Sequence, residues 1–454
     1  MNGKSYKLQN SDEAISDAMA LFTLPPTDVS CESRETWYYT SKNPIDDNIL
    51  LYVVDVPPGF MVKTDDIQLC MTGKVVNGDG SDIPSMPTTL WTKDPITEAE
   101  KTALLKSDVY PSNLLHSSMF KRVTIRIQDK TIDVCEYPYQ AFVDVMLDNS
   151  PRGTATREMM QGVFGHGPSE DGRSINKSHT KYDSRARFLS LKSVESREFE
   201  MRGPVFADIL MQPRPLLGNI RMVFEFERNP PNKVLSSLKP DADFKFEVTD
   251  AKLHVPLMRL RADINAASED MLRKNIPALY PYEKCCTKKF YLSSGRFSFD
   301  AEAIFQDYVP SEITVFMVPS ANYNGSYTKE FLRFANEKVK SVGFKIDNIP
   351  TPGPAMKLKW EADARQSILG DAIEAILSSK PNSGWNANKE FDLPFFHFDL
   401  RNTTNANVLP IVRKGLTKLE MVFDEALTEN VIVFVRGLFP AVMQISDNRQ
   451  VTLL

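Results

Sequence analysis

Residues 121–127 read Lys-Arg-Val-Thr-Ile-Arg-Ile, and residues 340–346 read Lys-Ser-Val-Gly-Phe-Lys-Ile. In both stretches, apolar residues alternate with polar or small ones. This is the pattern of a β-strand that turns one face toward a core. Each apolar position of the second stretch lies 219 residues after its counterpart, as from Val123 to Val342. The pair therefore indicates one β-rich unit that is present twice.

A second pair of matching segments supports the repeat. Met222-Val223-Phe224 recurs as Met421-Val422-Phe423, 199 residues later. The shorter offset is explained by a long polar stretch at 149–195, whose counterpart near 378–390 is shorter. A stretch of this length without strong apolar periodicity predicts a surface excursion.

Length and composition favour a folded chain of many short strands. At 454 residues, two or three domains are expected. The chain is 42% hydrophobic and 25% charged, as in folded soluble proteins, and its 30 prolines outnumber its 20 glycines. Prolines break helices and occupy turns, so this balance favours strands that are joined by turns.

The sequence therefore predicts an all-β fold of two tandem eight-stranded jelly-roll sandwiches, a double jelly roll, with a few short helices in loops. The expected parts are an N-terminal arm at 1–44, a first jelly roll at 45–257 and a second at 258–454. Strands are expected from Ile49 and at 67–76, 205–211, 220–227, 244–255, 419–423 and 431–435, and helices near 98–105 and 138–147.

Charge and cysteine content limit the class of partner and the compartment. The net charge is −5 and the pI is near 5.7, whereas a chain that covers nucleic acid is normally basic. The five cysteines contain no Cys-x-x-Cys pair, which indicates reduced thiols and synthesis in a reducing, intracellular compartment. We expect no secretory signal and no membrane span, because no stretch approaches ~20 apolar residues.

The usual catalytic and metal motifs are missing from the sequence. The five histidines are scattered and form no H-x-H or H-x-x-x-H pair, and no G-x-S-x-G is present. Carboxylates are plentiful, but no spacing selects a pair for glycoside hydrolysis. The sequence predicts no catalytic residue, no cofactor and no metal. A jelly-roll carbohydrate-binding module or enzyme stays open as the competing class.

Four short motifs, in order along the chain, resemble one family of viral proteins. They are Leu24-Pro25-Pro26 within Leu-Phe-Thr-Leu-Pro-Pro-Thr, Leu115-His116-Ser117 within Asn-Leu-Leu-His-Ser, Tyr137-Pro138-Tyr139 within Tyr-Pro-Tyr-Gln-Ala, and Asn324-Gly325-Ser326-Tyr327. Together they are similar to the major capsid proteins of Polinton (Maverick) elements and adintoviruses. The chain departs from the family at Leu216-Leu217-Gly218-Asn219, where members often read Leu-Leu-Asn-Gly.

The resemblance implies a double jelly-roll capsid protein. It implies homotrimers whose six barrels form a pseudo-hexagonal capsomer (hexon) of an icosahedral virion shell. The implied partners are other copies of the chain and penton or other minor capsid proteins, with no specific nucleic acid. A host gene derived from an integrated viral capsid gene is a further alternative.

Overall fold

The structure is a computed structural model of the chain. It describes residue 24, residues 27–84, residue 97, and residues 109–147, 196–237, 239, 241–306, 308–335, 337–361, 367–380, 395–402 and 408–453. The predicted helix near 98–105 and the whole of the excursion predicted at 149–195 lie outside these residues. So do Pro25 and Pro26.

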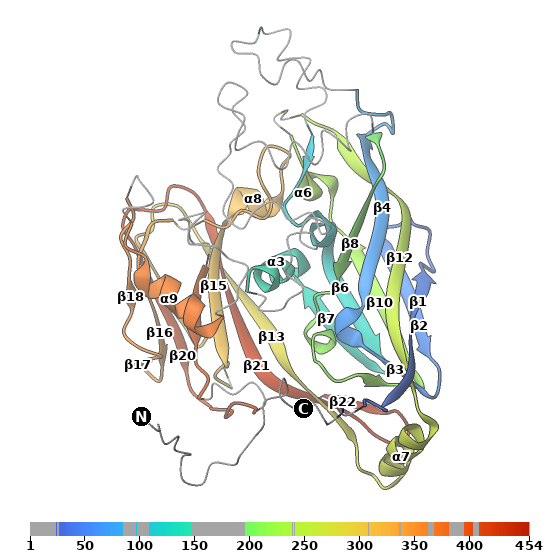
Figure 1. The fold of residues 1–454 in the computed structure, drawn as a ribbon. Helices are drawn as coiled ribbons and strands as arrows, with labels where there is room; N and C mark the ends of the chain where they lie inside the picture. The colour runs from blue at the N-terminus through green and yellow to red at the C-terminus, as the bar shows by residue number, and fades with distance from the viewer. Residues whose placement is uncertain are drawn as a thin grey trace, which may run out of the picture.

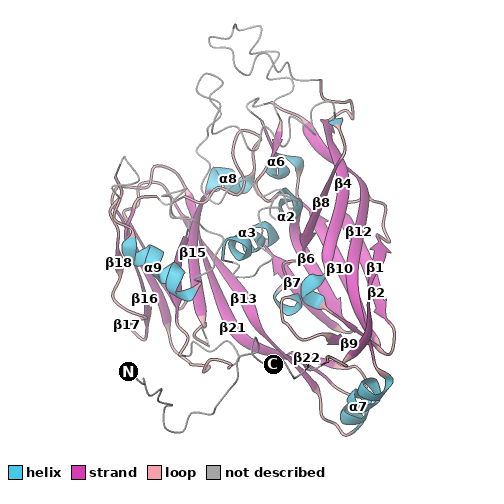
Figure 2. Ribbon diagram, viewed as in Figure 1, coloured by secondary structure: helices cyan, strands magenta, loops and turns pink. Residues whose placement is uncertain are grey.

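The described residues form two β-sandwiches that stand side by side (Figures 1 and 2). In the first, the strand order is β1-β12-β4-β8 in one sheet and β2-β10-β6-β7 in the other. Its strands are β1 (Cys31–Thr40), β2 (Ile49–Val56), β3 (Phe60–Val62), β4 (Gln68–Asn77), β5 (Tyr110–Pro111), β6 (Phe120–Ile127), β7 (Lys130–Cys135), β8 (Phe199–Pro204), β9 (Leu216–Leu217), β10 (Ile220–Arg228), β11 (Leu235–Ser236) and β12 (Phe244–Leu260).

The second sandwich repeats this strand order. Its sheets run β13-β21-β15-β19 and β14-β20-β16-β17. Its strands are β13 (Ala278–Leu292), β14 (Ser298–Glu302), β15 (Glu312–Pro319), β16 (Val339–Ile346), β17 (Ile349–Pro350), β18 (Met356–Lys357), β19 (Phe395–Asp399), β20 (Thr417–Phe423), β21 (Val431–Ile445) and β22 (Val451–Leu453). Eight strands of one sandwich therefore match eight of the other in chain order and in sheet position, which confirms the double jelly roll.

Helices lie in the connections. They are η2 (Thr64–Asp66), α2 (Leu115–Ser118), α3 (Tyr137–Leu147), η5 (Asp208–Leu210), α6 (Pro231–Val234), α7 (Ala262–Arg273), α8 (Ser320–Asn324) and α9 (Gly370–Ser379). α7 joins the sandwiches at one end of the molecule, and α3 lies between them (Figure 1).

The repeated segments are strands in equivalent places, but their pairing is not identical. β6 and β16 are separated by the predicted offset, and each is paired with the strand that carries the second motif, β10 or β20. Met222 lies opposite Ile127, whereas Met421 lies opposite Val342, four residues before Ile346. Because side chains alternate with period two, this even shift keeps the apolar residues on the inner face.

Two expectations about strands need correction. Residues 31–40, which the sequence placed in the arm, form β1, and β1 pairs along its length with β12. The strand expected at 205–211 is instead a loop with the 3-10 turn η5, and β8 ends at Pro204. Periodicity misled there because Phe206, Ile209 and Leu210 are buried by neighbouring elements without lying in a sheet.

The connection before β10 explains the departure from the Leu-Leu-Asn-Gly pattern. A Cβ atom on Gly218 would lie 2.2 Å from the carbonyl oxygen of Phe60, so only glycine fits there. Asn219 takes the left-handed conformation with φ 58°, which asparagine tolerates.

The outer faces of the sheets β2-β10-β6-β7 and β14-β20-β16-β17 carry rows of ion pairs, and we call them the charged ladder faces. On β2-β10-β6-β7, Arg122 pairs with Asp133 at 2.7 Å. On β14-β20-β16-β17, Lys418 lies 3.0 Å from Asp300 and 3.2 Å from Glu420. Most of these side chains are partly or largely exposed to water, so each pair contributes at most about 1 kcal/mol to stability.

A matched pair of substitutions on β10 tests the two faces. Phe224 is fully buried opposite Ile125, so Phe224→Ala should lower the free energy of unfolding by roughly 3–5 kcal/mol. Glu225→Ala, next along the strand, removes only an ion pair with Arg126 and should cost less than ~1 kcal/mol. Denaturant unfolding checks both, and equal costs would contradict the assignment of the faces.

Candidate functional site: the contact between the two jelly rolls

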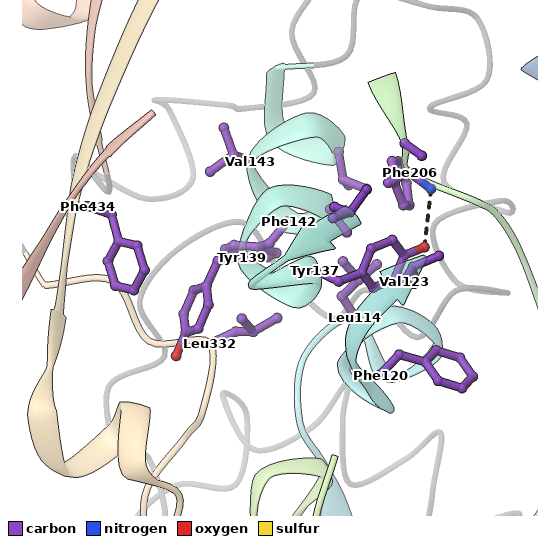
Figure 3. Close-up of a cluster of buried hydrophobic side chains, with 14 of the residues drawn as sticks. Leu114, Phe120, Val123, Tyr137, Tyr139, Phe142, Val143, Phe206, Leu332 and Phe434 are labelled. Atoms are coloured by element: carbon purple, nitrogen blue, oxygen red, sulfur yellow. Dashed lines mark hydrogen bonds between the residues drawn. The ribbon is translucent and has the colours of Figure 1, made fainter. Parts of the chain in front are cut away.

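Helix α3 of the first jelly roll packs on the outer face of the β13-β21-β15-β19 sheet of the second. Tyr139 lies at the centre of this contact and is 1% exposed. Its ring stacks on Phe434 with the centroids 5.1 Å apart and on Phe316 at 6.2 Å (Figure 3). Its hydroxyl donates to the carbonyl oxygen of Phe331 at 3.2 Å. Stacked aromatic rings combine a large buried area with directional contacts, so they fix the angle between the two rolls.

A buried arginine lies beside these rings. Arg436 of β21 forms an ion pair with Asp144 of α3, and its Nε donates to the Cys285 sulfur at 3.2 Å. Burial alone would lower the pKa of the Arg436 guanidinium, but Asp144, Cys285 and Asp208 together outweigh burial and raise it. Arg436 therefore stays charged, and the pair links the two rolls.

A network of one lysine ammonium, one tyrosine hydroxyl and one carboxylate lies at the other end of α3. Lys289 of β13 donates to the Glu136 carboxylate at 2.6 Å and to the Tyr323 hydroxyl at 3.1 Å. The Tyr323 hydroxyl in turn donates to Glu136 at 2.8 Å. The α3 N-terminus is thus joined to the second roll through charge-assisted hydrogen bonds.

The connection at 205–219 of the first roll meets the free edge of β13. The Asp208 carboxylate accepts from the Cys285 backbone N–H at 2.6 Å, and Arg214 donates to the Leu279 carbonyl at 2.8 Å. The Leu217 N–H donates to the Tyr280 hydroxyl at 3.1 Å. Burial raises the pKa of the Asp208 carboxyl. These side chains satisfy backbone groups that an edge strand would otherwise leave open.

Near the chain's last strands, Arg449 completes this row of contacts. It is 7% exposed, donates to the Gly218 carbonyl at 2.9 Å and pairs with Glu269 of α7. The second roll, the linking helix and the first roll are therefore tied at one residue.

A second cluster of polar side chains lies on the same sheet, beneath α9. Glu312 is 1% exposed, accepts a hydrogen bond from Lys380 at 3.0 Å and forms an ion pair with Arg401 at 3.0 Å. Burial tends to raise the pKa of the Glu312 carboxyl, but the two cations hold it below its usual value. His397 is fully buried beside it, and burial lowers the pKa of its imidazole to about 4. His397 lies in β19, so it is a buried strand histidine.

The Leu115-His116-Ser117 motif forms α2 and is buried in the first roll. His116 is 1% exposed, and its Nε2 lies 2.9 Å from the Leu69 carbonyl oxygen. Burial lowers the pKa of the His116 imidazole to about 4. Just before the motif, the Asn113 N–H donates to the Glu330 carboxylate of the second roll at 3.0 Å.

The Tyr137-Pro138-Tyr139 motif begins α3, and its two tyrosines point in opposite directions (Figure 3). The Tyr137 hydroxyl accepts from the Phe206 N–H at 3.2 Å within the first roll, whereas Tyr139 reaches the second roll. Pro138 is buried between them in the first turn, where its missing N–H costs nothing.

The Asn324-Gly325-Ser326-Tyr327 motif crosses in the other direction. Its residues end α8 of the second roll, and the Gly325 carbonyl accepts from Asn232 of the first roll at 3.1 Å. Gly325 has φ 87° and no room for a Cβ atom beside Lys233. The Tyr327 hydroxyl donates to the Phe244 carbonyl at 2.7 Å.

The structure therefore brings three of the four motifs together around one contact. The remaining motif is Leu24-Pro25-Pro26, of which only Leu24 is described. Leu24 is 94% exposed and forms no part of this contact. Sequence reasoning missed Asp144, Arg436, Asp208 and Arg449, because polar contacts between residues 77 or more positions apart leave no local signal. Their one trace is the arginine that stands inside the apolar run of β21.

Within the described residues, no group of three or more histidine, cysteine, aspartate or glutamate side chains could hold a metal ion. Among those same residues, no helix is both long and apolar enough to cross a membrane.

Comparison with solved structures shows the class of this fold. A chain of the cryo-EM structure of the Sputnik virophage has a TM-score of 0.63 at 11% identity and covers 100% of this chain and 94% of its own. The PBCV-1 virus capsid gives 0.56 at 7% identity, with 95% and 98% covered. The Faustovirus major capsid protein gives 0.53 at 8% identity, with 93% and 92% covered. At such low identity these likenesses show a shared double jelly-roll fold along nearly the whole chain.

Sequence comparison adds one curated relative. The chain is 26% identical over 155 residues to an uncharacterized protein of Caenorhabditis elegans, which is 34% of this chain and 37% of that protein. The chain thus spans little more than a third of the length of the curated relative that it matches. No family model matches the chain.

Two substitutions at Tyr139 test the contact. Tyr139→Ala removes the stacked ring and should lower the free energy of unfolding by roughly 3–5 kcal/mol. Tyr139→Phe keeps the ring and loses one hydrogen bond, at a cost of about 1 kcal/mol. Denaturant unfolding measures both. Equal losses would mean that the hydroxyl, and not the stacking, holds the contact.

The pH dependence of stability should depend on His116. Its folded pKa of about 4 lies below the ordinary 6.5, so the unfolded chain binds the proton first. The stability that His116 contributes is complete above pH 6.5 and is lost as the pH falls toward 4. His116→Gln should reduce the acid loss by up to roughly 3 kcal/mol. Unfolding free energies measured from pH 7 to pH 4 check this, and parallel curves for the two proteins would contradict it.

Proposed function

We propose that this chain is a structural capsid protein. In this proposal three chains associate as a homotrimer, so that six jelly rolls form a pseudo-hexagonal capsomer of an icosahedral, virus-like shell. The observation that carries the proposal is the fixed pairing of two similar jelly rolls within one chain, in a fold shared from end to end with viral capsid chains. A block that tiles a shell needs such repeated, similarly oriented modules.

The rigidity of the contact supports this role. α3 buries aromatic rings against the second roll, and ion pairs and hydrogen bonds to backbone groups surround them. A hinged pair of domains would have a smaller and more polar contact. The two rolls can thus act as one block of fixed shape, which repeated packing with neighbours requires.

We further propose a member of the Polinton (Maverick) and adintovirus type. Three of the four motifs on which that resemblance rests surround the contact between the rolls, where a constraint on the capsid block would act. The proposed partners are other copies of the chain and penton or other minor capsid proteins, in the virion shell. The role involves no catalytic turnover.

The division of the chain is also a proposal. We propose that the jelly rolls meet near residue 257, where β12 approaches its end before α7, and that the second extends from 258 to 454. The first would begin with β1 and not after residue 44, so the proposed arm precedes residue 31.

A host gene derived from an integrated viral capsid gene is a second candidate, and the nematode relative favours it. The sequence that flanks the gene separates the two candidates. Neighbouring genes for packaging or for minor capsid proteins favour a viral element, whereas an isolated gene among host genes favours a host function.

Self-assembly of the purified chain tests the proposed function. Size-exclusion chromatography with light scattering at micromolar concentration should give three times the chain mass of 51.3 kDa, and electron micrographs should show triangular or hexagonal blocks. A strict monomer that forms no particles would contradict the proposal. Specific binding on a glycan array, without association, would favour a carbohydrate-binding module.

A further inference from the structure

We propose that the segment 408–416 of one copy docks on the free edge of β1 in a neighbouring copy. This inference rests on the proposed self-assembly and names the surfaces that would carry it. The occupant of the β1 edge is thus a second copy of this chain.

The contact within one chain provides the template. The connection between β8 and β10, at 205–219, seals the free edge of β13 through Asp208 and Arg214. Most of its apolar side chains are buried, with Ile209 and Leu210 each 1% exposed, although Met211 is 37% exposed. One connection of the first roll thus covers the first strand of the second roll.

The repeat gives each part of this contact a counterpart. β19 and β20 of the second roll correspond to β8 and β10, so the connection at 400–416 corresponds to 205–219. β1 corresponds to β13, since each is the edge strand beside the long strand that closes its roll. Within one chain only one of the two equivalent contacts forms.

The unmatched connection is apolar and open to water. The segment 408–416 reads Val-Leu-Pro-Ile-Val-Arg-Lys-Gly-Leu, and its large apolar side chains are among the most exposed of the second roll. They are Val408 (54%), Leu409 (54%), Ile411 (67%), Val412 (54%) and Leu416 (46%). An exposed apolar surface that is continuous along the chain marks an interaction site.

The strand of the first roll that corresponds to β13 is β1, and one of its edges is free. Of the described strands, only β12 pairs with β1, so the other edge of β1 faces no strand. Its side chains are largely exposed, with Tyr38 at 63% and Trp37 at 36%. Such an edge offers backbone hydrogen-bonding groups and aromatic area to a partner.

Charge and symmetry favour the same pairing. Segment 408–416 carries Arg413 and Lys414 and no acidic residue, whereas β1 carries Glu32 and Glu35 against a single Arg34.

The surfaces lie on different rolls, so their contact is head-to-tail, and such contacts close into rings when the rotation allows. The contacts within and between chains would then alternate around a ring of six rolls.

Two measurements on the full chain test the inference. The first compares Ile411→Asp with Ile368→Asp by light scattering, since Ile368 is 60% exposed and lies outside the segment. We expect Ile411→Asp to weaken association at least tenfold and Ile368→Asp to associate as the unmodified chain does. Circular dichroism confirms that both variants are folded.

The second measurement places a benzoylphenylalanine photocrosslinker at position 411. Mass spectrometry should then find crosslinks to residues 31–40 of a second copy. If the chain forms trimers that Ile411→Asp leaves intact, or if the crosslinks fall elsewhere, the docking inference fails and the proposed function stands. If the unmodified chain is monomeric at every concentration, both fail.

Discussion

The burial of one sheet face by a neighbouring jelly roll is the constraint on which the rest of this structure depends. The outer face of β13-β21-β15-β19 carries two large aromatic rings, Phe316 and Phe434, beside Arg436. Exposure of these rings to water would be unfavourable. α3 covers it with Tyr139 and Asp144, so apolar area and charge are satisfied together. The two rolls thereby pack together through buried contacts, although each has the strand order of a complete jelly roll.

The two halves share an order of strands but not an environment. The connection at 205–219 is buried against β13, whereas its counterpart ends in the exposed segment 408–416. A strictly symmetric pair would leave both connections in the same state. The difference leaves apolar side chains of the second connection exposed to water, where most of those of the first connection are buried.

The fold could be predicted from the sequence because two local signals indicate it: the alternation of apolar and polar residues, and the repeat of matching segments. Every second residue is buried along most of the strands β6, β10, β16 and β20. This alternation lies in the local sequence and does not depend on which elements pack together. It failed where burial came from elsewhere: residues 205–211 are apolar yet lie in a loop, and β1 is too polar to look like a strand of a sandwich. The site was found only through the motifs, since pairs such as Asp144 and Arg436 depend on packing that no local pattern encodes.

The charged ladder faces bear on how such blocks would behave before they join. An apolar β-sheet face tends to associate with other proteins. Charged side chains such as Lys418, Asp300 and Glu420 stay hydrated, and removing their water costs free energy. Stacking two of these faces would strip water from many ions at once without new partners for them. At high concentration, subunits would thus not associate through these faces, and association would be left to surfaces without such rows of ion pairs.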